Sequence, residues 1–135
     1  MPEYIDRFNS VEEVEKCAEY YVELLGLQDW RIIYKLTDDF DENLAGLCES
    51  ERVSKIACIS IRKDLDKCEL WFKQPHEEIL IHELLHCVIP LLEKDTAEGA
   101  LFYDTYHQIL DSMARAIFKT RYNLTNKDFY FKREE

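Results

Sequence analysis

The strongest constraint on the fold is a helix that the sequence predicts from Pro75 onwards. Pro75 suits the start of a helix, and Glu77 and Glu78 place negative charge in the first turn, where the helix dipole favours anions. The segment that follows is mostly apolar, which is typical of a buried helix. It nevertheless contains two histidines four residues apart, His82 and His86, and residues at that spacing lie on one helix face. Both imidazoles can therefore approach one point in the protein interior.

Glu83 follows the first of these histidines and completes an H-E-x-x-H pattern over residues 82–86. Two histidines and a glutamate on a buried helix are costly to bury without partners. In the H-E-x-x-H pattern the two histidines bind Zn²⁺, and the glutamate acts as general base toward a water molecule. The sequence therefore predicts that His82 and His86 are zinc ligands and that Glu83 is a catalytic base.

Length and charge narrow the class of protein. With 135 residues, the chain fits a single domain, residues 1–135, with one hydrophobic core. The formal net charge of −11 argues against nucleic acid as a partner, because binding to phosphates needs a basic surface. Basic residues between Lys119 and Arg133 are interpreted as a solvated end of the chain.

The five cysteines form no C-x-x-C pair and are odd in number. We therefore expect buried free thiols in a reducing compartment rather than a disulfide framework or a zinc ribbon. The start of the chain shows no signal-peptide pattern, and no apolar run approaches the roughly 18 residues that span a membrane. We expect a cytoplasmic protein with no membrane partner, whose oligomeric state does not follow from its sequence.

Hydrophobic periodicity predicts the remaining elements of a small α+β domain. Ser10 and Glu13 form a capping box, and apolar residues at helical spacing continue from there to Gly26, a natural C-terminal cap. A second capping pattern at Asp95 predicts a last helix that ends near Arg121. Four segments between the first helix and the buried helix have strand character: Trp30 to Leu36, Leu44 to Ser50, Val53 to Arg62 and Lys67 to Lys73. Short links favour antiparallel neighbours, so we expect a three- to four-stranded, mostly antiparallel sheet.

A catalytic zinc ion usually has three protein ligands and one open position, so a third ligand is required. The metzincin continuation of the motif is excluded, because it needs glycine where Ile89 stands and histidine where Leu92 stands. The last helix offers Glu98, Asp104 and His107. His107 is favoured as the third metal ligand because it lies on the apolar side of that helix, but Asp104 and Glu98 stay open.

The sequence resembles the small zincin-type metallopeptidase domains, especially the SprT-like and the phage- or prophage-encoded metallopeptidases. The similarity extends over nearly the whole chain and includes Leu25-Gly26-Leu27, Asp29 to Ile32, Ala45-Gly46, Ala57 to Ile61, Ile81 to His86, Ile109-Leu110 and Met113 to Ala116. It implies a minimal zincin-like fold in which an N-terminal helix and a sheet precede the motif helix and a C-terminal helix. Family members often carry the third ligand early in that final helix, where His107 stands.

The activity expected from these features is zinc-dependent hydrolysis of a peptide bond in a protein or peptide substrate. Glu83 would take the proton of a water molecule and pass it to the leaving amine. Tyr103, one helical turn before His107, is preferred over Tyr106 as the donor that steadies the oxyanion.

The resemblance also implies how the substrate binds, because zincins commonly pair an extended substrate with an exposed strand that precedes the motif helix. Lys67–Lys73 and Val53–Arg62 are the two strands that we consider for this role. The competing interpretation of the whole chain is a non-catalytic, zinc-stabilised interaction module, or a phage-type regulator that acts on one dedicated protein partner.

Overall fold

The computed structural model describes residues 3–40, 44–67, 74–89, 97–125 and 128, with only the backbone for residues 67 and 97–102. The elements follow in the order α1 (Val11–Leu24), β1 (Arg31–Thr37), β2 (Gly46–Glu51), β3 (Ile56–Arg62), a 3-10 turn (Leu65–Lys67), α2 (His76–Val88) and α3 (Ala97–Tyr122). The expected α+β class is confirmed, with one helix before the sheet and two after it.

Helix α1 begins and ends as the capping signals predict. The Ser10 hydroxyl accepts a hydrogen bond from the Glu13 N–H at 3.3 Å. The Glu13 carboxylate in turn accepts a hydrogen bond from the Asn9 N–H at 3.2 Å. At the other end Gly26 adopts φ +72°, a left-handed conformation that glycine reaches without steric cost. The Leu27 N–H then donates to the Val22 carbonyl at 2.8 Å, which closes a Schellman motif.

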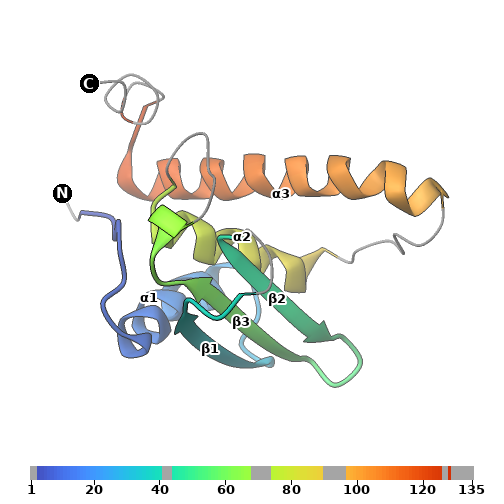
Figure 1. Cartoon of the computed structure of the whole chain (residues 1–135), viewed down its shortest axis with the longest axis horizontal. Coiled ribbons are helices and arrows are strands. Elements are labelled where there is room, and N and C mark those ends of the chain that lie inside the picture. Colours follow the sequence, from blue (N-terminus) through green and yellow to red (C-terminus); the bar gives the residue numbers. More distant parts are fainter. Residues whose placement is uncertain (1–2, 41–43, 68–73, 90–96, 126–127, 129–135) are drawn as a thin grey trace.

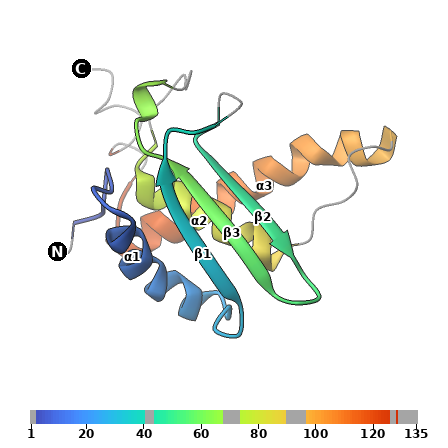
Figure 2. The same cartoon turned by 60° about the horizontal axis from the view of Figure 1, so that its bottom comes forward.

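The sheet is mixed and has the strand order β1-β3-β2 (Figure 2). Strand β3 pairs parallel with β1 and antiparallel with β2, so the expectation of a mostly antiparallel sheet is wrong. That expectation treated strands that follow one another in sequence as neighbours in the sheet. Instead the chain passes from β1 to β2 at the opposite edge, and β3 then pairs between the two. Burial explains the order. Strand β3 buries Ala57, Ile59 and Ile61, and β2, which carries two exposed glutamates, suits an edge.

The strand boundaries differ in detail from the sequence expectation. Strands β2 and β3 form a hairpin, and the strand expected from Val53 begins at Ile56 because Val53 lies in the turn, 93% exposed. The strand expected from Leu44 begins at Gly46. The strand expected over Lys67–Lys73 falls on residues 68–73, which lie outside the described residues, and Lys67 itself belongs to the 3-10 turn.

Helices cover one face of the sheet, and α3 lies on the far side of α2 from the sheet (Figure 1). Helix α2 is therefore enclosed between the strands and α3, and Leu80, Ile81, Leu84 and Leu85 are all 0% exposed. This position explains why the motif helix is apolar on nearly every side rather than along one stripe. The helix ends at Val88, as the proline at position 90 predicts. The capping residues expected at Asp95 lie outside the described residues.

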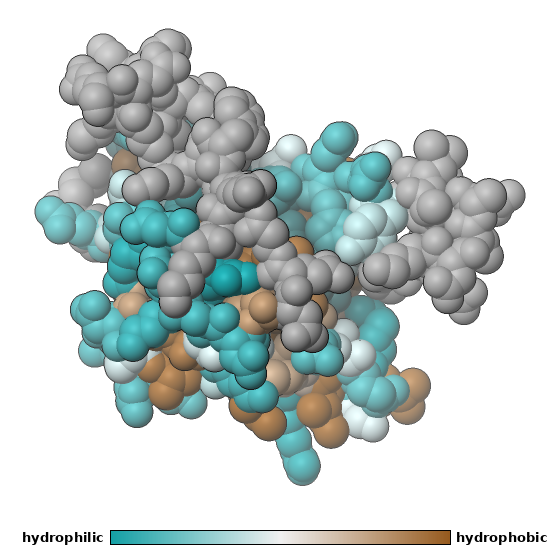
Figure 3. Space-filling model, in the orientation of Figure 1, coloured by the Kyte–Doolittle hydropathy of each residue, from teal (hydrophilic) through white to brown (hydrophobic). Residues whose placement is uncertain are grey.

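The opposite face of the sheet carries no helix within the described part of the chain. Ile33 on β1 and Ile56 on β3 are 59% and 41% exposed there. Figure 3 shows apolar residues at the surface along the lower side of the view, where the sheet lies.

Buried polar side chains anchor the first turn of α2. The Glu77 carboxylate, with the residue 0% exposed, accepts hydrogen bonds from the hydroxyls of Tyr21 and Tyr122 and from Arg121 Nη1, the last at 2.9 Å. These donors come from α1 and α3, so one carboxylate joins three helices. This network holds the C-terminal end of α3 against the first turn of α2.

His76 is the first residue of α2 and plays a structural part. Its Nδ1 accepts from the Phe8 N–H at 2.8 Å, which leaves Nε2 to donate to the Arg62 carbonyl at 2.9 Å. Burial lowers the pKa of His76 to about 4. The neutral imidazole therefore connects the N-terminal segment, β3 and α2.

The four described cysteines, Cys17, Cys48, Cys58 and Cys87, are free thiols, as expected; Cys68 lies outside the described residues. Over the described ranges, no helix combines the length and the hydrophobicity needed to cross a membrane.

Candidate metal centre

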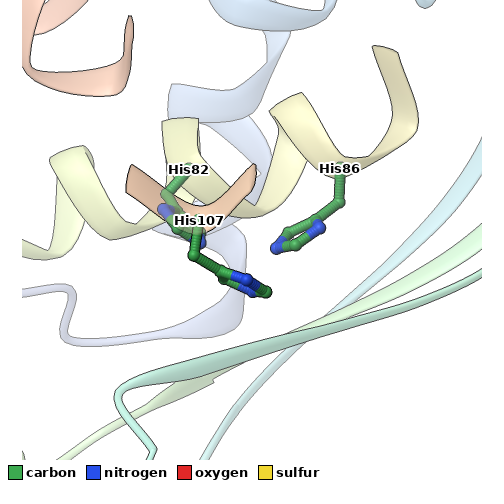
Figure 4. Close-up of side chains that lie close together, drawn as sticks. All are labelled: His82, His86 and His107. Atoms are coloured by element: carbon green, nitrogen blue, oxygen red, sulfur yellow. The ribbon is translucent and has the colours of Figure 1, made fainter. Parts of the chain in front are cut away.

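The structure brings three histidines together between α2 and α3 (Figure 4). Helix α2 supplies His82 and His86, one turn apart, and α3 supplies His107. Each offers a ring nitrogen within 4.8 Å of one from each of the others, and the ring centroids are 5.1 to 5.8 Å apart. Nitrogen ligands on a tetrahedral zinc ion are about 3.4 Å apart, so only a small closure separates this arrangement from a coordination site. The three histidines lie close enough to bind one metal ion.

Hydrogen bonds fix the tautomer of each histidine. His82 Nδ1 lies 2.8 Å from Asp111 Oδ1, and His107 Nδ1 lies 3.1 Å from the Tyr103 carbonyl. A carboxylate and a carbonyl only accept, so both Nδ1 atoms carry the proton when the rings are neutral. In both residues Nε2 is then left with a lone pair for a metal ion.

The third ring is oriented by Tyr106. Its hydroxyl donates to the Ile89 carbonyl at 2.8 Å and lies 2.9 Å from His86 Nδ1. Because the hydroxyl proton is already used, the tyrosine oxygen accepts from His86 Nδ1–H, and His86 Nε2 is left as the acceptor nitrogen. Burial lowers the pKa of His86 to about 4, with His82 and His107 adding to the effect. A neutral imidazole at this position is the form that binds a metal.

His82 differs in its electrostatics. Burial lowers its pKa, but the Asp111 carboxylate on Nδ1 and the nearby Glu83 outweigh that effect, and the net shift is upward. Asp111 thus orients the ring and increases its basicity, as carboxylate partners of metal-binding histidines do.

Glu83 lies beside the histidines and is only 5% exposed. Its Oε1 is 3.8 Å from His86 Nε2, and no donor in the described part of the chain forms a hydrogen bond with the carboxylate. Burial raises the pKa of Glu83 to about 7. Gly46 on β2 makes room for it, because a Cβ at that position would lie 2.8 Å from Glu83 Oε2. The carboxylate is thus held between α2 and the edge strand, beside His86.

A cleft of about 520 Å³ opens at the three histidines. One wall is β2 and the residues before it, from Leu44 to Cys48. The other wall is formed by α2 and α3, and Glu83, Tyr103 and Asp111 line it together with the histidines. The cluster therefore faces an open cleft, with a sheet edge alongside.

The residues expected from the sequence are placed as follows. His82, His86, Glu83 and His107 lie together, and Tyr103 lines the cleft with its ring centroid 4.4 Å from that of His107. Asp104, weighed as a third ligand, is exposed and is not part of the metal-binding group. The side chain of Glu98, the other alternative, lies outside the described residues.

Sequence reasoning missed three contributors. Asp111 follows His107 by four residues, so a search of the same helix face would have found it. Tyr106 was considered only as an oxyanion donor, and its contact with His86 depends on how α2 and α3 pack. The close approach of Gly46 to Glu83 has no local signal beyond the presence of glycine in a strand.

Comparison with protein-family models found no match, and searches of curated proteins and of solved structures found none either. The function must therefore be argued from the site itself.

Proposed function

We propose that the chain is a zinc-dependent peptidase. The observation that carries the proposal is the combination of three histidines with available Nε2 atoms and a buried glutamate, 3.8 Å from one of them, on the wall of one open cleft. The donor set fits zinc, which imidazole nitrogens bind at about 2.0–2.1 Å. A zinc ion held there supplies Lewis acidity, which lowers the pKa of a water molecule toward 7 and polarises a carbonyl group.

The number of ligands favours catalysis over a purely structural metal. Structural zinc sites are closed by four protein ligands, whereas catalytic ones keep a position open. Among the described residues, the group contains three histidines and no fourth ligand, and these histidines line the cleft. Within the described part of the chain, the alternative of a zinc-stabilised interaction module therefore finds no fourth ligand.

The chain's own residues suit proton transfer. Glu83 is within reach of the metal-facing side of His86 and lines the cleft, so it can take a proton from water and return it to a leaving amine. Asp111 and Tyr106 keep two of the rings in the metal-binding tautomer. Tyr103 is the residue we assign to the developing oxyanion, since it lines the cleft with its ring centroid 4.4 Å from that of His107.

Strand β2 is the surface we assign to an extended peptide. The earlier candidate Val53–Arg62 contains β3, which is paired on both sides and cannot accept another strand. Strand β2 is paired with β3 alone in the described sheet and forms a wall of the cleft. Among the described residues its outer backbone groups have no strand partner, which suits strand addition beside the metal centre.

The test compares the wild type with Glu83→Gln, both loaded with zinc, on a peptide library made by digesting a proteome with an endoprotease that cuts after glutamate. We expect zinc content and folding to be kept and cleavage to fall by at least about 100-fold. Glu19→Gln is the matched control, because Glu19 is exposed on α1. Cleavage by Glu83→Gln within a few-fold of wild type, or a wild type that binds no zinc, would refute the proposal.

A further inference from the structure

The side chains of β2 divide between its two faces. Leu47, Glu49 and Glu51 lie on the face away from α2, in register with Ser60, Cys58 and Ile56 of β3. Gly46 and Cys48 alternate with them and face the helix that carries the metal ligands. A peptide added beside β2 would continue this alternation, so every second side chain would stand next to Leu47, Glu49 or Glu51.

Glu49 is the acidic residue best placed for recognition. It is exposed, and no hydrogen bond or ion pair to it is found within the described residues. Glu51 is engaged, because its carboxylate accepts the backbone N–H groups of Val53 and Ser54 at 3.2 and 2.6 Å. The hydrogen bonds of Ser54 also hold the pKa of Glu51 below its usual range. Glu51 is therefore held by the turn that follows β2, whereas the Glu49 side chain has no partner among the described residues.

The basic residues on this face are further from Glu49 than an added strand would be. Arg31 and Lys35 stand on β1, two strands away and two residues out of register with Glu49, so their backbones are about 12 Å from that of Glu49. The Lys35 side chain lines the same surface pocket as Glu49, but no ion pair joins the two residues. An added strand lies only about 4.8 Å from β2. In the row of Glu49, the neighbour on β3 is Cys58. A cation on the added strand would therefore stand closer to Glu49 than the backbone of either basic residue of β1 does.

The cleft adds no competing positive side chain. Among the described residues that line it there is no lysine or arginine, and Asp111 contributes a further carboxylate. Glu83 is 95% buried, has no hydrogen-bond partner among the described residues and lines the cleft at Gly46. Since Gly46 is three residues from Glu49 along β2, the reacting position and the charge are separated by about 10 Å.

We propose that the edge of β2 selects extended polypeptide substrates with a lysine or arginine beside Glu49, two to four residues from the bond that is cut. The proposal rests on the proposed function for the position of the reaction, but not for the binding preference. An apolar residue two positions away would stand beside Leu47, which is 37% exposed. The substrate class is thus a cationic segment with alternating side chains, attracted to a protein with a net charge of −11.

Binding is measured separately from turnover. The zinc-loaded Glu83→Gln protein is titrated with fluorescein-labelled peptides of ten residues, in which valine alternates with lysine, glutamine or glutamate, and anisotropy reports the affinity. Opposite-charge pairs across strands contribute about two- to fivefold each in affinity. We expect the lysine peptide to bind at least about fivefold more tightly than the glutamate peptide, with a difference that shrinks as salt rises.

The decisive variant is Glu49→Lys, added to the Glu83→Gln background. It should reverse the preference, whereas Glu19→Lys on α1 changes the net charge equally and should leave the ratio within about twofold. Equal affinities for the three peptides, absence of binding, or the same shift in both lysine variants would overturn the inference. In the wild type, cut sites in the peptide library should carry lysine or arginine two to four residues away on one side. Charge-selective binding without zinc-dependent cleavage would refute the proposed function and keep the binding preference.

Discussion

Replacing Gly46 with alanine tests whether the position of the Glu83 carboxylate controls the activity. A Cβ at this position would lie 2.8 Å from Glu83 Oε2, 3.2 Å from Glu83 Cγ and 3.0 Å from Ile79 Cγ2. Ordinary contact starts at 3.4 Å, so the carboxylate must move by about 0.6 Å and the isoleucine methyl by about 0.4 Å. Glu83 Cγ is close to the backbone of α2, so rotation of the carboxylate alone does not relieve the contact.

The magnitudes follow from these displacements. Overpacking of a well-packed site costs about 1–3 kcal/mol of stability. A shift of about 1 Å in a catalytic group costs about 100-fold in rate, so a shift of about 0.6 Å should lower kcat/KM by about 10- to 100-fold. No histidine is among the three nearest atoms that the new Cβ would meet, so zinc content should stay at that of the wild type.

Gly26→Ala separates loss of stability from loss of activity. Gly26 has φ +72° and no atom near an added Cβ, so alanine costs about 1–2 kcal/mol in backbone strain without touching the site. Denaturant unfolding, metal content and cleavage of the peptide library are measured for both variants. Wild-type turnover in Gly46→Ala, or an equal loss of turnover in Gly26→Ala, would refute the reasoning that β2 positions Glu83.

Three further predictions concern the metal centre and the buried histidine of α2. His107→Ala should abolish stoichiometric zinc binding while Asp104→Ala keeps it, as measured by mass spectrometry of the metal content; loss of zinc in both would contradict the assignment of His107. Tyr106→Phe and Asp111→Ala should each weaken zinc affinity by about 10- to 100-fold in competition with a chromophoric chelator, because each removes the acceptor that holds a histidine tautomer; unchanged affinity would mean that the rings are oriented by packing alone. The pKa of His76 is about 4 in the folded protein against 6.5 when unfolded, so the unfolded state binds the proton first as pH falls, and stability present above pH 6.5 is lost toward pH 4. That loss is about 2 kcal/mol at pH 5, and the stability difference between pH 7.5 and pH 5 should be smaller by this amount in His76→Gln; equal differences in the two proteins would exclude the linkage.

The first and motif helices were predictable because their signals are local. Ser10, Glu13 and Gly26 mark the ends of α1 within a few residues of the atoms they satisfy. The spacing of His82 and His86 places both rings on one face of any helix that forms there. Neither conclusion depends on what packs against the helix.

The sheet was predicted less well because pairing is not local. The strands were recognised by composition, but the sequence order β1, β2, β3 does not reveal that β3 takes the centre. That choice follows from which strand buries most apolar surface once all three are side by side. The mixed sheet and the position of β2 at the edge of the cleft therefore required the assembled core.

The sequence by itself determined that two histidines share one helix face and that a glutamate follows the first of them, and it left the third ligand open among His107, Asp104 and Glu98. Only the tertiary structure decided which of the candidates on α3 meets the pair on α2, and that Asp111 and Tyr106 orient two of the rings. It also decided that Gly46 lies against Glu83, where a larger residue would displace the carboxylate. The physical reason is that helix caps and residue spacing act within one or two turns, whereas these contacts depend on how distant elements pack around one buried helix.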